Sequence, residues 1–254
     1  MTTHANTFVW YDAMTSDIKA AEAFYAKAIG WNIKDSGMPG TSYLLLSAGP
    51  VQVGGLMPIP PDAKGARPAW MGYVGVDDVD AFAAKVAAAG GAIHRPAADI
   101  PGVGRFSVAA DPHGAVFVLF KGNGEAMPPA APGTPGHIGW RELHAGDGET
   151  AFAFYSGLFG WTKDYAHDMG PMGVYQTFAA DGAQIGGMMT KMAQTPAPHW
   201  LYYFNVDDID AAKARVEGAG GKSLMGPTEV PGGGWSVQCL DPQGAMFGML
   251  GAKR

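Results

Sequence analysis

Short apolar runs, separated by turns rich in glycine and proline, alternate along the chain with longer segments of helical spacing. The run FVWYDAM (8–14) predicts a strand. The segment 16–30 that follows repeats apolar residues every three or four positions, through Ala20, Phe24 and Ala28, and predicts a helix. Ser16 or Asp17 is its expected N-cap. Three further apolar runs, WNIKDS, TSYLLLS and VQVGGLM, complete a βαβββ unit.

A second unit of the same order follows. The run WMGYVGV (70–76) predicts a strand, and segment 77–89 predicts a helix that Asp77 caps and that Gly90 and Gly91 end. Three short strands then follow, and the turn DPHG joins the last two of them. The first half of the chain therefore predicts two βαβββ units.

The second half repeats the first at a shift of 130 residues, with a slip of two residues only in a middle loop. Trp10, Tyr25, Trp31, Trp70, Asp111 and Gly114 fall on Trp140, Tyr155, Trp161, Trp200, Asp241 and Gly244. The segment 122–136 is rich in Gly and Pro and has no apolar periodicity. We therefore expect an α+β fold of four βαβββ units, with domains at 1–121 and 137–254 and a linker at 122–136.

Composition excludes several classes of protein. The net charge is −6 and the 17 Lys and Arg residues are scattered, so no basic surface for nucleic acid is expected. The start of the chain lacks a basic segment followed by an apolar run, and no stretch reaches the roughly 18 apolar residues of a membrane span. We expect a cytoplasmic protein with no membrane partner. The single cysteine, Cys239, lies among apolar residues and predicts a buried structural thiol.

Three motifs recur in the same order in both halves: W-x(6)-D-x(6)-FY followed by GW, then VDD-[VI]-D, then DPxG. In this order they resemble the vicinal oxygen chelate superfamily, which includes glyoxalase I, bleomycin-resistance proteins and extradiol dioxygenases. The resemblance implies that paired βαβββ units curl eight strands into an open cup. It also implies that metal-dependent members carry His, Gln or Glu at inward positions of the cup.

The positions that the resemblance assigns to metal ligands hold other residues here. They are Trp10 and Trp140, Met71 and Leu201, Val118 and Gly248, and the pairs Gly54-Gly55 and Gly186-Gly187. None of these side chains is a ligand for a hard divalent ion. We therefore predict cups without a metal or other cofactor.

Two acids are the candidate catalytic residues. Strand side chains alternate, so Asp12 and Glu142 share the face of Trp10 and Trp140, and burial beside an indole would favour proton uptake by a carboxylate. Either acid is a candidate general base. The alternative is a structural role, in which the acids bind main-chain amides or the side chains of Arg105, Arg141 or Lys19.

Aromatic, methionine and lid residues are the candidate ligand contacts. Trp10, Trp140, Tyr43, Tyr175, Met57 and Met188 would form apolar walls, unless they simply belong to the core. The loops PGVGR and PGGGW would cover the two cups and place Arg105 and Trp235 at equivalent positions. The strand alternation places His144 and His199 on the same face as the cup-lining residues, but their counterparts in the first half are Met14 and Ala69. They are candidate ligand contacts of a site in the second half only, and the alternative is that they are internally satisfied or solvated histidines.

Three functions follow from these residues. The first is binding of a small hydrophobic or aromatic molecule in metal-free cups, as a monomer or homodimer. The second is a metal-independent isomerase, lyase or hydrolase that uses Asp12 or Glu142 as the base. The third is a metal-dependent glyoxalase or dioxygenase, which the residues at the ligand positions disfavour.

Overall fold

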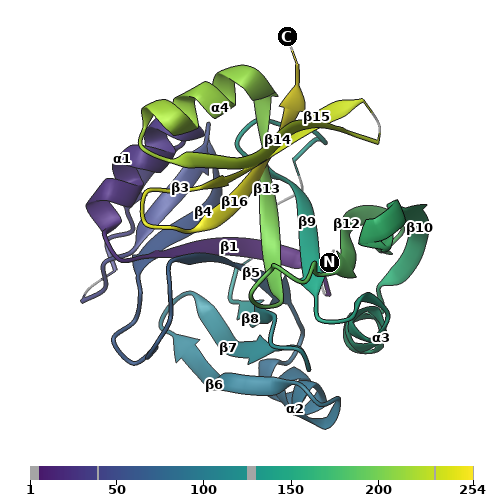
Figure 1. Ribbon diagram of the computed structural model, residues 1–254. Helices are drawn as coiled ribbons and strands as arrows, with labels where there is room; N and C mark the ends of the chain where they lie inside the picture. Colours follow the sequence, from purple (N-terminus) through teal and green to yellow (C-terminus); the bar gives the residue numbers. More distant parts are fainter. Residues whose placement is uncertain (1–5, 39, 125–129, 232, 254) are drawn as a thin grey trace. The chain divides into compact units, whose positions relative to one another are not determined.

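The computed structural model describes residues 6–38, 40–124, 130–231 and 233–253 (Figure 1). The first half contains two βαβββ modules. The first consists of β1 (Phe8–Thr15), α1 (Ile18–Ala28), β2 (Asn32–Asp35), β3 (Leu44–Ala48) and β4 (Val51–Pro58). The second consists of β5 (Ala69–Gly75), α2 (Val79–Ala88), β6 (Ala92–Ile100), β7 (Gly104–Ala110) and β8 (Val116–Gly122).

The second half repeats this order with one short 3₁₀ turn added. Its first module consists of β9 (Ile138–Ala145), α3 (Gly148–Phe159), β10 (Thr162–Asp168), η1 (Gly170–Met172), β11 (Val174–Ala180) and β12 (Ala183–Thr190). Its second module consists of β13 (His199–Asp208), α4 (Ile209–Gly218), β14 (Lys222–Val230), β15 (Gly234–Leu240) and β16 (Met246–Ala252). The four predicted βαβββ units are confirmed.

Each half forms one open, mixed, eight-stranded sheet. The strand orders are β2-β3-β4-β1-β5-β8-β7-β6 and β10-β11-β12-β9-β13-β16-β15-β14. Within each module the first and last strands pair in parallel, for example β1 with β4 and β9 with β12, and the other neighbours pair antiparallel. The α+β fold expected from the sequence is therefore correct.

The helices begin and end where capping chemistry places them. The side chain of Asp17 accepts a hydrogen bond from the Ala20 amide and is the N-cap of α1. Asp78, and not the predicted Asp77, caps α2, because its carboxylate accepts from the Ala81 amide. Gly30 follows α1 at φ 88° and Gly90 follows α2 at φ 86°, a conformation that favours glycine.

The contacts between residues divide the chain into two compact units that do not follow the halves. Unit 1 contains the described residues within 1–10, 72–129 and 141–200, and unit 2 contains those within 11–71, 130–140 and 201–254. Each unit therefore combines a module from one half with a module from the other. Residues 125–129 of the predicted linker lie outside the described part of the chain, whereas Gly136 accepts a hydrogen bond from the indole of Trp31 in unit 2.

A hydrogen-bond chain between repeated motif residues ties unit 2 together. The Trp70 indole donates to the Tyr25 hydroxyl (2.9 Å), which donates to the carboxylate of Asp241 (2.9 Å). Burial and the neighbouring Asp241 raise the pKa of Tyr25 well above its usual value, and burial raises the pKa of Asp241. Tyr25 and Asp241 come from opposite halves of the sequence, so the motifs join modules across the duplication.

Unit 1 contains the equivalent chain. The Trp200 indole donates to Tyr155 (3.0 Å), which donates to Asp111 (3.3 Å), the acid of the first DPxG turn. Asp111 also accepts from the amides of His113 and Ala115, which closes the turn. The residues that identify the repeat are therefore buried structural residues.

The only cysteine, Cys239 on β15, is buried as predicted. Burial raises the pKa of its thiol to about 12. The thiol therefore has the character of a core side chain. No helix in the described part of the chain combines the length and the apolar character needed to cross a membrane.

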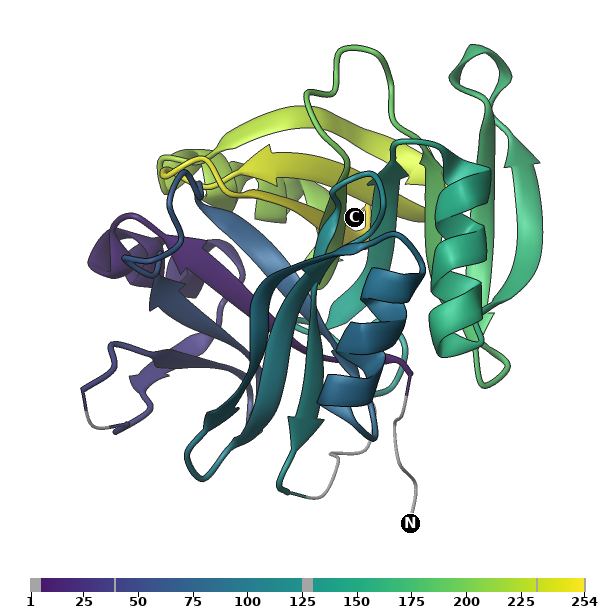
Figure 2. The same ribbon diagram turned by 90° about the horizontal axis from the view of Figure 1, so that it is seen from below.

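The helix pairs of the two units differ. In unit 2, α1 and α4 pack together, and the Lys27 ammonium and Arg215 guanidinium donate to the carbonyls of Gly218 and Ala28. In unit 1, α2 and α3 lie side by side (Figure 2), and Gly157 stands where the repeat places Lys27.

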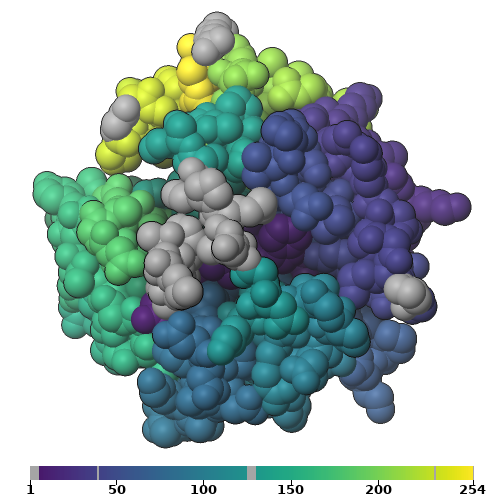
Figure 3. Space-filling view, turned by 180° about the vertical axis from the view of Figure 1, so that it is seen from behind, coloured from purple at the N-terminus to yellow at the C-terminus, as the bar shows by residue number. Residues whose placement is uncertain are grey.

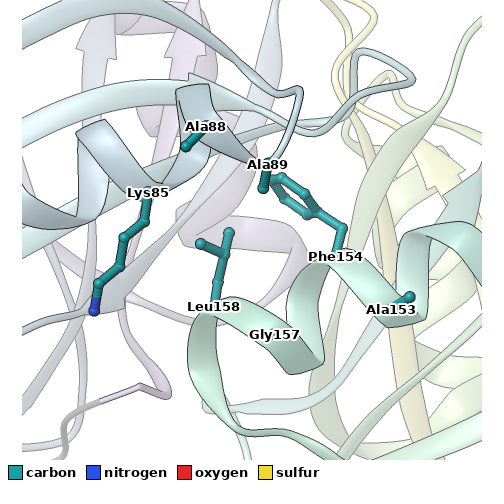
Figure 4. Close-up of a pocket in the computed structure, with 7 residues that line it drawn as sticks. All are labelled: Lys85, Ala88, Ala89, Ala153, Phe154, Gly157 and Leu158. Carbon is teal, nitrogen blue, oxygen red and sulfur yellow. The ribbon is translucent and has the colours of Figure 1, made fainter.

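A shallow hollow of about 370 Å³ lies between α2 and α3, and Gly157 is part of its lining. Phe154 and Leu158 extend from α3 toward α2, and Lys85 is the one charged residue of the lining (Figure 4). The space-filling view from behind shows residues of α2 and β6, coloured blue to teal, at the surface of the molecule (Figure 3).

Candidate functional site

Asp12 and Tyr43 form the first polar site, together with Gly55. Asp12 lies on β1, is 3% exposed, and accepts a hydrogen bond of 2.7 Å from the Tyr43 hydroxyl. Gly55 on β4 pairs with Asp12, and a Cβ atom at Gly55 would overlap the Tyr43 ring. The tyrosine therefore lies over the glycine, and its hydroxyl fixes one carboxylate oxygen.

Glu142, Tyr175 and Gly187 form the equivalent arrangement in the second half. Glu142 lies on β9 and accepts a hydrogen bond of 3.0 Å from the hydroxyl of Tyr175 on β11. Gly187 on β12 pairs with Glu142, and a Cβ atom there would overlap the Tyr175 ring. Both candidate bases are thus bound by a phenol, which the sequence did not predict although it named both tyrosines as wall residues.

His144 and His199 join Glu142, Tyr175 and Gly187 in the second polar site. The two imidazole rings stack with centroids 4.8 Å apart and an interplanar angle of 9°. His144 Nε2 lies 2.8 Å from Glu142 Oε1, but the two atoms do not meet hydrogen-bond geometry. The Nε2 atoms of both histidines are buried and have no hydrogen-bond partner among the described residues.

The main chain fixes the protonation of His199. Its Nδ1 lies 3.0 Å from the carbonyl oxygen of Ala197, and because a carbonyl only accepts, Nδ1 carries the proton. Burial lowers the pKa of His199, the hydrogen bond to Ala197 raises it by a smaller amount, and His144 and Glu142 have still smaller effects that oppose each other. His199 is therefore neutral near pH 7, and its Nε2 presents a lone pair.

The structure corrects the expected role of one wall residue. Met188 pairs with Leu143, which is fully buried, whereas Met189 pairs with His144. Residues paired across a parallel register face the same side of a sheet, so Met189 shares the face of Glu142 and Met188 belongs to the core. The segment between Trp161 and Tyr175 is two residues longer than the segment between Trp31 and Tyr43, so Met57 corresponds to Met189.

Met57 lies beside Met14 and shares the face of Asp12, because both pairs belong to the β1–β4 register. Trp10 and Trp140 are partly buried on β1 and β9. Their contact with a ligand remains a prediction.

The two predicted lid residues make contacts of their own. Arg105 on β7 bonds the carboxylates of Asp80 (2.7 Å) and Asp99 (2.9 Å), and its guanidinium holds the pKa of Asp80 below its usual value. Trp235 on β15 lies under the ammonium of Lys253, 4.5 Å from the ring centroid. Arg105 thus connects β7 with α2 and β6, and a lid role for either residue remains a prediction.

The comparisons with known proteins agree with this fold. The model of the Glyoxalase/Bleomycin resistance protein/Dioxygenase superfamily matches residues 7–119 and 135–249. The chain belongs to this superfamily. A putative glyoxylase, CFP32 of Mycobacterium tuberculosis, is 35% identical over 244 residues, which cover 95% of this chain and 93% of that protein. The anthracycline biosynthesis protein DnrV of Streptomyces peucetius is 30% identical over 256 residues, covering 95% and 91%.

Solved structures of the superfamily share the fold at low identity. The Mn(II)-bound glyoxalase from Novosphingobium aromaticivorans superposes with a TM-score of 0.66 at 19% identity, covering 98% of this chain and 83% of that one. A variant of homoprotocatechuate 2,3-dioxygenase from B. fuscum superposes with a TM-score of 0.69 at 13% identity, covering 100% and 74%. At these identities the likeness concerns the fold alone.

The donor set of this chain does not fit the metal that the name of that glyoxalase implies. Tyrosine rings cover three of the glycines at the superfamily ligand positions: Tyr43 over Gly55, Tyr175 over Gly187, and Tyr203 over Gly248. Gln238 donates to the Tyr203 hydroxyl at 2.8 Å and holds that ring. Within the described residues, no three His, Cys, Asp or Glu side chains are grouped so that they would hold a metal ion.

Proposed function

We propose that this superfamily member binds a small hydrophobic or aromatic molecule at its two polar sites without a metal ion. The observation that carries the proposal is that a tyrosine ring fills the space of a ligand side chain at Gly55 and again at Gly187. A metal-binding side chain at either position would displace a packed phenol, at an overpacking cost of about 1–3 kcal/mol.

The residues that remain are those of an organic binding site. Each polar site offers one carboxylate, and methionines lie on the same face: Met14 and Met57 in the first half, Met189 in the second. Apolar surface with a few fixed polar groups is typical of small-molecule sites, and methionine adapts to irregular ligands. A relative whose name refers to anthracycline biosynthesis is in keeping with a small organic ligand.

A second candidate function is metal-independent proton transfer at Glu142. One observation favours it over the same role for Asp12: Glu142 Oε1 lies 2.8 Å from an imidazole nitrogen, His144 Nε2. A general base with an adjacent imidazole can pass a proton onward. In that case Glu142→Gln abolishes turnover of the bound compound, while Asp12→Asn does not.

Native mass spectrometry with elemental analysis, on protein purified without added metal, tests the proposal. We expect no stoichiometric metal, together with an organic ligand that is retained or taken up from an added aromatic compound. Stoichiometric divalent metal whose removal abolishes ligand uptake would overturn it. The same spectra decide between a monomer and a homodimer.

A further inference from the structure

The second polar site contains a buried nitrogen atom whose hydrogen-bonding capacity is unused. This is the Nε2 atom of His199, which has no hydrogen-bond partner among the residues described. A buried polar atom left unpaired costs about 1–3 kcal/mol. Such an atom, on a ring held by stacking against His144, therefore indicates a surface built for a polar group from outside the chain.

The kind of group follows from the hydrogen-bond roles at the site. His199 Nε2 is an acceptor, because the Ala197 carbonyl fixes the proton on Nδ1. The Glu142 carboxylate is a second acceptor, and one of its oxygens already accepts from Tyr175. A ligand group at this site must donate a hydrogen bond, and an anionic group would face the charge of Glu142.

The first half lacks this surface. Met14 stands in place of His144 and Ala69 in place of His199, whereas the tyrosine–carboxylate pair is kept. The described residues include no grouped set of three metal donors there. The pair is therefore suited to a hydrogen-bonding organic ligand.

We infer that the second polar site selects aromatic compounds that carry a neutral hydroxyl group, which donates its hydrogen bond to His199 Nε2. The inference rests on the proposed function and specifies its ligand class. His144 is a positioning residue, because its ring stacks on His199 and holds the accepting nitrogen in place. The first polar site, with Ala69 at the equivalent position, does not discriminate in this way.

Fluorescence titration with 2-naphthol and naphthalene, which differ by one hydroxyl group, tests the inference. We expect the wild-type protein to bind 2-naphthol about tenfold more tightly at pH 7, the effect of one hydrogen bond at a desolvated acceptor. His199→Phe keeps an aromatic ring against His144 but removes the acceptor, and His199→Ala copies the first half. Both variants should lose the preference for 2-naphthol over naphthalene, which is measured as the ratio of the two dissociation constants within each variant.

Each outcome has a distinct meaning. Equal binding of 2-naphthol and naphthalene to the wild type, or an unchanged preference in His199→Phe, would overturn the inference and leave the proposed function intact. Tighter binding of 2-naphthoate than of 2-naphthol would also overturn it, since an anion cannot donate. Failure of the folded wild type to bind any of the three probes would overturn the proposed function itself.

Discussion

The two polar sites share one packing arrangement and differ in the chemistry around it. In both, a tyrosine hydroxyl donates to a carboxylate and the tyrosine ring lies over a glycine. Asp12 is 3% exposed and lies on a strand beside Met14. The side chain of Glu142 is 13% exposed and lies against the imidazole of His144.

This difference separates what the fold requires from what a ligand requires. The tyrosine and glycine are retained in both halves because they fill the same space next to the same strand pair. The neighbouring positions change from Met14 and Ala69 to His144 and His199 without loss of that packing. The second site is therefore the one to which we assign the additional binding chemistry proposed above.

The largest effect is expected from a methyl group at the shared glycines. Gly187→Ala places a Cβ atom inside the Tyr175 ring, and we expect it to lower the free energy of unfolding by about 1–3 kcal/mol, with a similar loss for Gly55→Ala. Urea denaturation measures both. As the control, Gly187→Ala combined with Tyr175→Ala should lose less than the sum of the two single variants, and strict additivity would show that the ring and the glycine are not coupled.

Removing the tyrosine hydroxyls should show that the two carboxylates are not equally buried. Tyr43→Phe removes a hydrogen bond to the buried carboxylate of Asp12, so we expect the free energy of unfolding to fall by about 1–3 kcal/mol. Tyr175→Phe should cost less than about 1 kcal/mol, because Glu142 is more exposed to water. Chemical denaturation of both variants provides the comparison, and a larger loss for Tyr175→Phe would contradict the assigned burial.

The repeat in the sequence was sufficient to predict the four modules, since strand alternation, helix spacing and DPxG turns are local signals. Several other features depend on partners far apart in the sequence. Tyr25 bonds Asp241 in the other half, and Tyr43 reaches Asp12 only through the register of β3, β4 and β1. Asp78 and not Asp77 caps α2. The sequence could not distinguish the two adjacent acids, because moving the start of a helix by one residue leaves the spacing of its apolar residues unchanged.

The repeat predicts which face of the sheet a residue lies on only where the connecting loops of the two halves have the same length. Met188 was predicted as a wall residue, whereas the two-residue insertion makes Met189 the counterpart of Met57. Strand alternation placed His144 and His199 on the same face as the cup-lining residues, but it did not predict that their rings stack. The unpaired Nε2 of His199 depends on burial, which no sequence pattern specifies.

The smallest effect is a pH dependence confined to the second site. Burial lowers the pKa of His199 below its ordinary value of 6.5, so on acidification the unfolded chain takes up a proton before the folded one does. Stability should therefore fall as the pH decreases from above 6.5 toward the lower pKa of the folded protein.

His144→Met combined with His199→Ala, which copies the first half, should remove this part of the pH dependence. We expect the free energy of unfolding of the double variant at pH 7 to stay within about 1 kcal/mol of the wild type, because the change also removes the unpaired buried nitrogen of His199. Thermal melts of both proteins across the acidic range measure the effect. If both proteins lost the same amount of stability on acidification, the pH dependence would have to come from groups other than these histidines.

The most direct test of metal-free binding is the affinity for 2-naphthol measured after treatment with EDTA and again after addition of excess Mn²⁺. If the tyrosine-covered glycines leave no metal site, the dissociation constant should be the same in both conditions, within about twofold. Loss of 2-naphthol binding in EDTA, with recovery when Mn²⁺ is added, would contradict the account and show that ligand binding requires a metal ion.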